Sequence, residues 1–381
     1  MPEAYIVGAV RTPVGRRGGG LSGIHPVDLG AAALQALAER TGVDPGEVED
    51  VIFGCVDQIG AQSFNLGRGC VLTAGWPEHV PGTTVDRQCG SSLQAVHFAA
   101  QGVLSGTQDI VVAGGVETMS TVPLMSSTTV GVENGLGSPW EAEGFTQRYG
   151  GEISQFRGAC MMTRRFELSR EDLDAFALQS HQRALAAWEA GRFDDEVVAV
   201  AGVTRDEGPR ADTSAEKLAA LKSLEGYPEL TAGIASQISD GAAAVMVASE
   251  RAVERLDLQP LAKVKDLVVV GADPIEMLSG PIPATEAILR RNDLSIDDID
   301  LFEVNEAFAP VVVGWSRATG ASLERTNVNG GAIALGHPLG ATGAKLTTTI
   351  VHELRRREGR YGLVAICEGG GTANATLLER V

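Results

Sequence analysis

The chain has 381 residues, of which 44% are hydrophobic and 21% are charged, and its formal net charge at pH 7 is −18. The excess of acidic side chains argues against nucleic acid or an anionic membrane surface as the main partner, although a local basic patch can still hold a phosphate. No run of about eighteen apolar residues predicts a transmembrane helix, and the length favours two domains or a duplicated fold.

The five cysteines form no CxxC pair, and a set this sparse and odd in number predicts reduced thiols in the cytoplasm. The first residues contain no basic segment followed by an apolar stretch, so we expect no secretion signal. No His and Cys cluster has the spacing of metal ligands, and no GxGxxG run predicts a dinucleotide site.

Each half of the chain begins with the same predicted order: a strand, a helix that starts at a proline, and a short apolar run. These elements lie at 4–10, 26–40 and 51–53 in the first half, and at 265–270, 281–291 and 301–302 in the second. The repeat continues with a turn, a helix and a buried strand, and the last core strand is expected at 362–367. Mostly apolar strands suit a sheet covered on both faces, so we predict a duplicated, mainly parallel α/β fold.

A different segment, residues 119–238, separates the two halves. It contains a loop-rich stretch at 120–150 and then a predicted helix, at whose start Ser169 and Asp172 resemble an N-cap pair. A long excursion inside a compact fold usually has a function, so we expect an insertion that covers the substrate, with an oligomer contact as the alternative. The expected domains are 1–118, completed by about 239–258, then 119–238, and 259–381.

Matching junctions of the two repeats hold groups suited to covalent chemistry. Cys89 follows a predicted strand and precedes a predicted helix, and a thiol at a helix N-terminus is favoured as thiolate. His337 stands at the corresponding junction of the second half. A pseudo-twofold relation would bring them together as the nucleophile and base of acyl transfer. Taken singly, a buried cysteine is usually inert, and a histidine before a proline is more often a structural hydrogen-bonding group.

Glycines and polar residues follow two other predicted strands. Cys367 precedes Glu368 and three glycines, whose backbone can approach a ligand closely and offer N–H groups to an oxyanion. Asn305 and Glu306 follow an apolar strand, and the carboxyl ends of strands are where α/β ligand sites form. Either of these two residues could instead be a helix cap.

Four spaced motifs resemble those of the thiolases: Cys89 in CGSS, NEAF at 305–308, GGAIALGHPLGATG at 330–343, and Cys367 before three glycines. The resemblance covers nearly the whole chain. It implies a thiolase-like duplicated α/β/α/β/α layered fold with an inserted loop domain. It also implies an acyltransferase that cleaves a 3-ketoacyl-CoA, with coenzyme A as co-substrate, or that runs the reverse condensation through an acyl-Cys89 intermediate.

The resemblance implies a role for each catalytic position. Cys89 is acylated, His337 activates it, and Cys367 moves the proton at the α-carbon. Asn305 holds a water that forms one oxyanion hole with His337, and the backbone N–H groups of Cys89 and Gly369 form the other. The implied contacts with CoA and with its pantetheine or acyl channel are Arg210, Ser236, Ala232, Met277, Ala307 and Phe308. For Met277 and Phe308 an ordinary core position is the alternative.

Two stretches depart from the family pattern. Many thiolases have Met-Gly-x-Thr-Ala-Glu where this chain has QFRGAC at 155–160, and Thr-Ala-Gly-Asn-Ala-Ser becomes TAGIAS at 231–236. Runs at 152–156, 236–240 and 367–374 resemble actinobacterial thiolases of steroid ring degradation. We therefore expect an acyl group bulkier than acetoacetyl, with a ring, and by family resemblance a homodimer or homotetramer.

Two other functions are alternatives, a ketoacyl synthase and a non-catalytic lipid carrier or scaffold. Ketoacyl synthases place His–His or His–Asn beside their cysteine, so Cys367 and the NEAF run argue against the first. A non-catalytic relative is expected to lose Cys89 or His337, and this chain has both.

Overall fold

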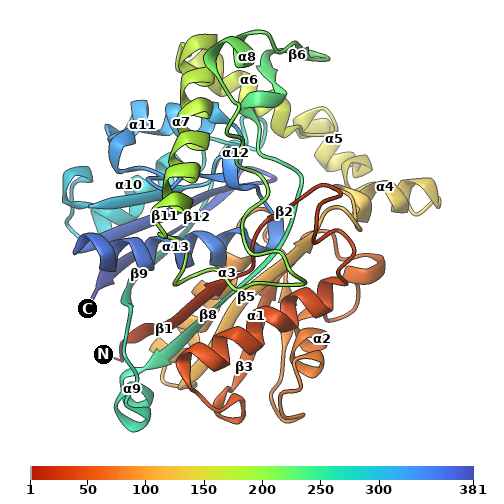
Figure 1. The fold of residues 1–381 in the computed structure, drawn as a ribbon. Helices are drawn as coiled ribbons and strands as arrows, with labels where there is room; N and C mark the ends of the chain where they lie inside the picture. The colour runs from red at the N-terminus through yellow and green to blue at the C-terminus, as the bar shows by residue number, and fades with distance from the viewer. Residues whose placement is uncertain (1) are drawn as a thin grey trace.

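A large mixed sheet runs through the molecule, with helices on both of its faces (Figure 1). The computed structural model describes residues 2–381. Its strands are β1 (Ala4–Arg11), β2 (Gly15–Arg16), β3 (Asp50–Gly54), β4 (Thr83–Val85), β5 (Ile110–Thr118), β6 (Ser223–Leu224), β7 (Tyr227–Thr231), β8 (Ser239–Ser249), β9 (Ala262–Gly271), β10 (Leu301–Val304), β11 (Tyr361–Glu368) and β12 (Thr372–Arg380). Its helices are α1 (Pro26–Thr41), α2 (Leu66–Thr73), α3 (Ser91–Leu104), α4 (Ser126–Glu133), α5 (Glu143–Tyr149), α6 (Gln155–Arg165), α7 (Arg170–Glu189), α8 (Ala215–Ala219), α9 (Glu250–Leu256), α10 (Pro281–Arg291), α11 (Ala309–Thr319), α12 (Ala332–Leu335) and α13 (Thr342–Arg357).

The predicted duplication is visible in the strand pairing. In the first half β3 pairs parallel with β5, β5 pairs antiparallel with β8, and β8 pairs antiparallel with β1. In the second half β10, β11, β12 and β9 repeat these relations in the same order. The two halves join where β1 pairs with β9 at Tyr5 and Ile6. The division into three domains stays a prediction.

The prediction of a mainly parallel sheet is wrong. Within residues 2–381, the parallel pairs of the large sheet are β3 with β4, β3 with β5, and β10 with β11, and its other pairs are antiparallel. One cause is a tight turn: Gly370 (φ 84°) and Gly371 (φ 76°) reverse the chain between β11 and β12. The strand that contains Cys367 is therefore not the last one, because β12 follows it as a hairpin partner.

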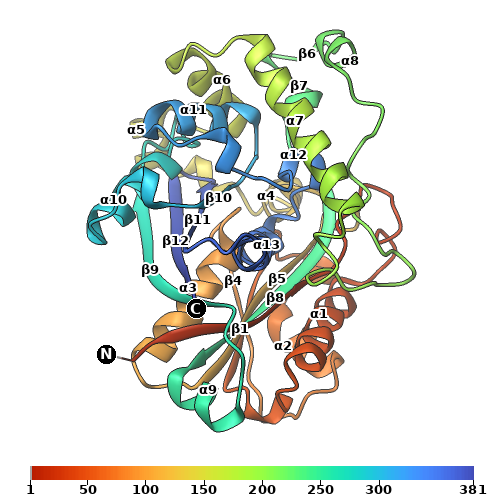
Figure 2. The same cartoon turned by 60° about the vertical axis from the view of Figure 1, so that its left-hand side comes forward.

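The helices α3 and α13 lie between the two halves of the sheet. Figure 2 views α13 nearly end-on in this position. They approach closely because Gly343 has no side chain: a Cβ there would lie 2.1 Å from the backbone nitrogen of Leu93. Ala344 N also donates to Ser92 Oγ (2.9 Å) at the N-terminal ends of the two helices. As expected from the repeat, α3, which follows Cys89, therefore packs against α13, which follows His337.

The remaining helices pack their apolar faces against the sheet and complete the layers. α1 and α2 pack on the outer face of the first half, and α10 and α11 pack on the outer face of the second. The order helix, sheet, helix, sheet, helix confirms the predicted layered fold. None of the helices within residues 2–381 has the length and apolar character required to span a membrane.

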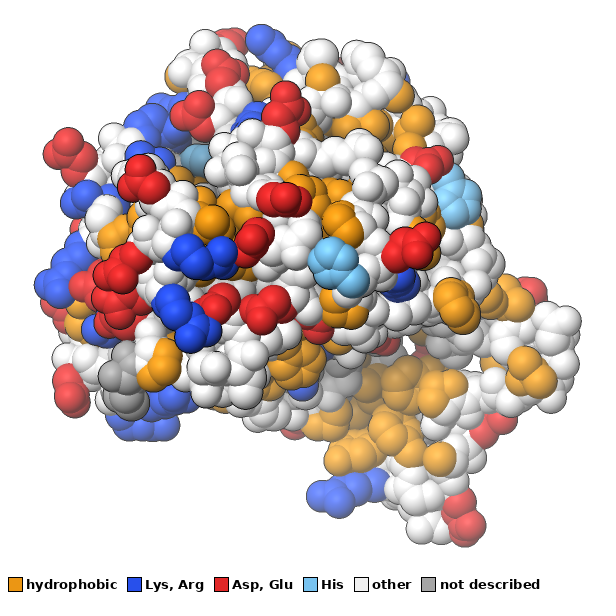
Figure 3. Space-filling model, turned by 90° about the horizontal axis from the view of Figure 1, so that it is seen from below, with side chains coloured by type: hydrophobic (Ala, Val, Ile, Leu, Met, Phe, Trp, Pro, Cys, Tyr) orange, Lys and Arg blue, Asp and Glu red, His pale blue; other side chains and the backbone are white. Residues whose placement is uncertain are grey.

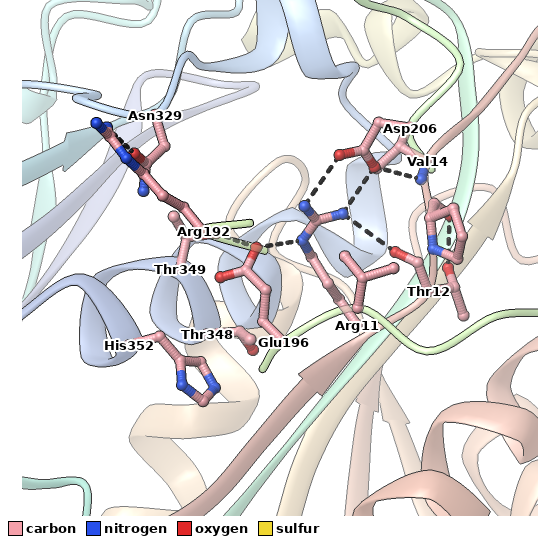
Figure 4. A network of polar contacts seen from close by, with 12 residues as sticks. Arg11, Thr12, Val14, Arg192, Glu196, Asp206, Asn329, Thr348, Thr349 and His352 are labelled. Carbon is pink, nitrogen blue, oxygen red and sulfur yellow. Dashed lines mark hydrogen bonds and ion pairs between the residues drawn. The ribbon is translucent and has the colours of Figure 1, made fainter. Parts of the chain in front are cut away.

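The segment between β5 and β8 contains α4 to α8 and the small β6–β7 sheet. The predicted N-cap of α7 is confirmed, because Ser169 Oγ accepts from Asp172 N and the Asp172 carboxylate accepts from Ser169 N. A buried ion-pair network anchors the chain after α7 (Figure 4): Arg11, 1% exposed, contacts Glu196 and Asp206, each at 2.7 Å. Breaking such a buried pair is strongly destabilising, so this network holds the loop that leads to Arg210.

Candidate active site

Cys89 lies in a tight turn between β4 and α3. Gln88, directly before it, has a left-handed backbone (φ 49°), and Gly90 is the N-cap of α3. The predicted position at a strand-to-helix junction is therefore confirmed, with the thiol two residues before the first helical residue. The other four cysteines are free and buried, whereas Cys89 is partly exposed.

A cavity of about 450 Å³ opens beside the Cys89 thiol. It is lined from three parts of the chain, of which the segment between β5 and β8 supplies a large share, including Leu124, Trp140, Ile153 and Phe156. The second half supplies Met277, Leu278, Leu339, Cys367, Glu368, Gly369 and Gly370. The structure thus brings both cysteines and Gly369 to one cavity, covered by the segment that we expected to cover the substrate.

Close backbone contact holds the two cysteine loops together. A Cβ on Gly369 would lie 2.8 Å from Gln88 Oε1, and one on Gly90 would lie 2.0 Å from Glu368 Oε1. Glycine at these positions lets the turn after β11 rest on the Cys89 turn.

His337 lies buried in the loop before α13, and its hydrogen bonds indicate its tautomer. Its Nδ1 is 2.6 Å from Thr342 Oγ1, and that hydroxyl donates its single hydrogen to Pro338 O (2.9 Å). Thr342 must therefore accept from Nδ1–H, which leaves the lone pair on Nε2. Asn305 Nδ2 lies 3.2 Å from Nε2. Asn305 Oδ1 is buried without a partner within residues 2–381, which leaves it free to accept from a water.

Burial decides the protonation of these groups at rest. It lowers the pKa of His337 to about 3, with a smaller contribution from Lys345, and so keeps the imidazole neutral. Burial, then Cys367 and Glu368, raises the pKa of Cys89 well above its usual value. Burial also raises the pKa of Cys367 to about 12. The direction of this shift opposes a resting thiolate at Cys89, because desolvation acts against the helix N-terminus. A thiol protonated at rest would pass its proton to a base as it reacts.

A second cavity, of about 270 Å³, contains basic groups. Arg210 and Ala232 line it with His181, Lys217 and Gln237. Gln237 Nε2 donates to the carbonyl oxygens of Ile333 and Ala334, in the segment that leads to His337. Arg210 and Lys217 are the cations of this lining, and Asp212, which also lines it, pairs with Lys217 at 2.7 Å.

The other predicted contacts are Ser236, Ala307, Phe308 and Met277, and the first three adjoin residues of the cavity linings. Ser236 N donates to Ala307 O (3.0 Å), and Ala235 forms a backbone bridge with Phe308. Phe308 is buried and packs edge-on against Phe156, with ring centroids 5.4 Å apart. Ser236, Ala307 and Phe308 line neither cavity, whereas Met277 lines the first.

Thr342 and Glu368 have no role in the sequence-based prediction, and Glu306, predicted as a polar group at the end of a strand, has a structural role. Thr342 stands five residues after His337 inside the glycine-rich motif at 330–343, so a search for the histidine's hydrogen-bond partner could have found it. Glu368 adjoins Cys367, and no local pattern assigns it a role. Glu306 accepts from Ser180 Oγ (2.7 Å), Asn327 Nδ2 (2.9 Å) and Ile333 N (3.0 Å), which makes it a support for the loop before His337.

Comparison with known proteins agrees with this geometry over the full chain. Residues 4–251 match the family description "Thiolase, N-terminal domain" and residues 258–380 match "Thiolase, C-terminal domain". The chain is 55% identical over 387 residues to steroid 3-ketoacyl-CoA thiolase FadA6 of Mycobacterium tuberculosis, covering 100% of this chain and 95% of the relative. It is 41% identical over 405 residues to a beta-ketoadipyl-CoA thiolase of Acinetobacter baylyi, covering both chains fully. The crystal structure of human mitochondrial 3-ketoacyl-CoA thiolase in complex with CoA superposes with a TM-score of 0.90 at 36% identity, covering 100% of this chain and 98% of that one.

Proposed function

The chain belongs to the thiolase family of acyltransferases, and on that premise we propose that it cleaves 3-ketoacyl-CoA through an acyl-Cys89 intermediate, or runs the reverse condensation. The observation that supports this most is the pair of cysteines that line one cavity, Cys89 and Cys367, with a neutral imidazole buried in the loop before α13. A nucleophile, a base and a separate proton carrier are the groups that the two half-reactions need.

In the first half-reaction Cys89 Sγ attacks the 3-keto carbon and its proton passes to His337 Nε2. The bond between C2 and C3 breaks, its electron pair leaves as the enolate of acetyl-CoA, and the Cys367 thiol protonates the α-carbon. In the second half-reaction the CoA thiol gives its proton to the Cys367 thiolate and attacks the Cys89 thioester. The Cys89 sulfur then recovers its proton from His337.

Two oxyanions develop in this sequence, and the loops around Cys89 and His337 would supply a site for each. The backbone N–H groups of Cys89 and Gly369 would donate to one, and His337 with a water on Asn305 would donate to the other. A preorganised donor of this kind lowers the activation free energy by about 3 kcal/mol.

CoA would span the two cavities. Its phosphates would meet Arg210 and Lys217 in the second cavity, while the pantetheine arm would pass Ser236 and Ala307 toward Cys89. The segment 119–238, proposed as a separate inserted domain, would cover this path, with residues 1–118 and 239–258 as one core half and 259–381 as the other.

We expect a bulky 3-ketoacyl-CoA with a ring to be a better substrate than acetoacetyl-CoA, because the cavity is large and partly apolar. A small acyl group would leave Leu124, Ile153 and Phe156 without an apolar partner. About 1.4 kcal/mol less stabilisation of the transition state lowers kcat/KM tenfold, so the expected preference is at least about tenfold. The measurement is kcat/KM for thiolysis across acyl-CoAs of increasing bulk.

Phe156→Ala provides the matched variant, since it removes one apolar side chain of the cavity and no group that transfers a proton. It should reduce kcat/KM for the bulky substrate more than for acetoacetyl-CoA. A wild-type enzyme that prefers acetoacetyl-CoA would be a general short-chain thiolase, and this result would refute the proposal of a ring-bearing substrate.

We propose a homodimer formed through the β4 edge of the sheet, with a tetramer as a further assembly. β4 is the outermost strand on its side, and an unpaired edge invites pairing with another chain. Hydrophobic side chains also gather in a hollowed area of the face shown in Figure 3, and Phe64, Phe98 and Met125 are exposed. Light scattering at micromolar concentration should give at least twice the chain mass of 39.8 kDa, and a monomer alone would refute the proposal.

Five free thiols support a reducing compartment, so we place the enzyme in the cytoplasm. The alternatives remain testable with the same acyl-CoA assay. A lipid carrier or scaffold would bind acyl-CoA without turnover, and a ketoacyl synthase would require a carrier-protein thioester as its acceptor.

A further inference from the structure

The carboxyl group of Glu368 lies beside both cysteines of the candidate active site. Glu368 ends β11 directly after Cys367, and both residues line the cavity that Cys89 lines. Its side chain is 0% exposed. Because a Cβ on Gly90 would lie 2.0 Å from Glu368 Oε1, the carboxyl packs directly against the backbone next to the nucleophile.

Hydrogen bonding at this carboxyl is incomplete. Glu368 Oε2 accepts from the Thr372 hydroxyl, whereas Oε1 has no partner within residues 2–381. Asn374 Oδ1 lies 2.9 Å from the same Cβ position on Gly90 and likewise lacks a partner in that range, while Asn374 Nδ2 donates to Gly90 O (3.2 Å). Two buried acceptors without a donor are costly, and a proton on Glu368 would supply the missing donor.

We propose that Glu368 is a positioning residue of the acyl-transfer site, whose neutral carboxyl bonds to Asn374 beside Cys89 and whose ionisation opposes thiolate formation at both cysteines. This inference rests on the proposed function, from which the roles of Cys89 and Cys367 are taken. The residue acts through the two thiols, so its effect appears in their acidity.

Burial and the neighbouring charges set the direction of this effect. Burial raises the pKa of Glu368 to about 7, opposed by the Thr372 hydroxyl and Arg87, with Asp86 adding to the rise. The carboxyl is therefore neutral below about pH 7 and negative above it. Once ionised, Glu368 contributes to the raised pKa of the Cys367 thiol and, after burial and Cys367, to that of Cys89. Rising pH thus creates a charge that works against the thiolates.

Glu368→Gln tests the proposal, because the amide keeps the donor toward Asn374 and the acceptor for Thr372 but never ionises. The measurement is the pH dependence of iodoacetamide alkylation at Cys89, followed on the Cys89 peptide by mass spectrometry. We expect the alkylation midpoint to fall by about 1 pH unit relative to wild type. Thr372→Val should move it in the same direction, since loss of the hydroxyl keeps Glu368 neutral to higher pH.

Glu152→Gln is the matched control, because Glu152 lines the same cavity but is exposed. Its alkylation midpoint should equal that of wild type. Equal midpoints for wild type and Glu368→Gln, or an equal fall in Glu152→Gln, would overturn the proposal. Alkylation needs no acyl-CoA, so failure of the enzyme to form acyl-Cys89 would refute the proposed function without altering this result.

Discussion

Replacing Cys89 with alanine should lower kcat for thiolysis by on the order of 10⁶-fold, the size of loss seen when a nucleophile that acts with a base is removed. Without Sγ no thioester forms. The oxyanion donors remain in place, but the tetrahedral oxyanion that they would stabilise is no longer produced. The measurement is steady-state cleavage of a 3-ketoacyl-CoA, with circular dichroism to show that the fold is retained.

Cys70→Ala is the control for this variant. It makes the same chemical change in α2, where the thiol is buried in the outer core of the first half. Its kcat/KM should stay near wild type despite a small loss of stability. A Cys89→Ala enzyme with activity similar to Cys70→Ala would exclude Cys89 as the nucleophile.

Cys367→Ala should separate acylation from proton transfer. Acetyl-CoA can still transfer its acyl group to Cys89 in this variant, because the CoA thiolate is a good leaving group that can take its proton from water, whereas the α-carbon of the enolate needs a positioned donor. Turnover should fall by about 10²- to 10⁴-fold, since no group then protonates the enolate or accepts the proton of CoA. Rapid-quench measurement of enzyme acylation, compared with steady-state thiolysis, would detect the difference. Thiolysis near the wild-type rate would assign the proton transfer to another group.

The sequence predicts the repeat and its layers well because both depend on local pattern. Prolines at the starts of α1 and α10 and apolar runs at the strands occur in both halves, and the structure has these elements close to the expected bounds. Strand direction is a different matter. A strand buried on both faces has a continuous apolar run whichever way it points, so β8 and β12 could not be recognised as antiparallel. Glycines after a strand, as at Gly370 and Gly371, are compatible with an oxyanion site as well as with a hairpin turn.

The site is predictable where a residue has chemistry of its own and unpredictable where its role depends on packing. Cys89, Cys367 and Gly369 do line one cavity. The high pKa of the Cys89 thiol results from burial, which no local motif reveals. Ser236, Ala307 and Phe308 line neither cavity. Family resemblance predicts a contact from the position of a residue in the chain, and it does not give the direction of the side chain.

The central claim, that the acyl group is carried by Cys89, is tested most directly by intact-protein and peptide mass spectrometry after incubation with an acyl-CoA in the absence of free CoA. We expect one added acyl group per chain, located on the peptide that contains Cys89, retained in Cys367→Ala and absent in Cys89→Ala. An adduct that persists in Cys89→Ala, or that maps to Cys367 in the wild-type enzyme, would contradict the claim.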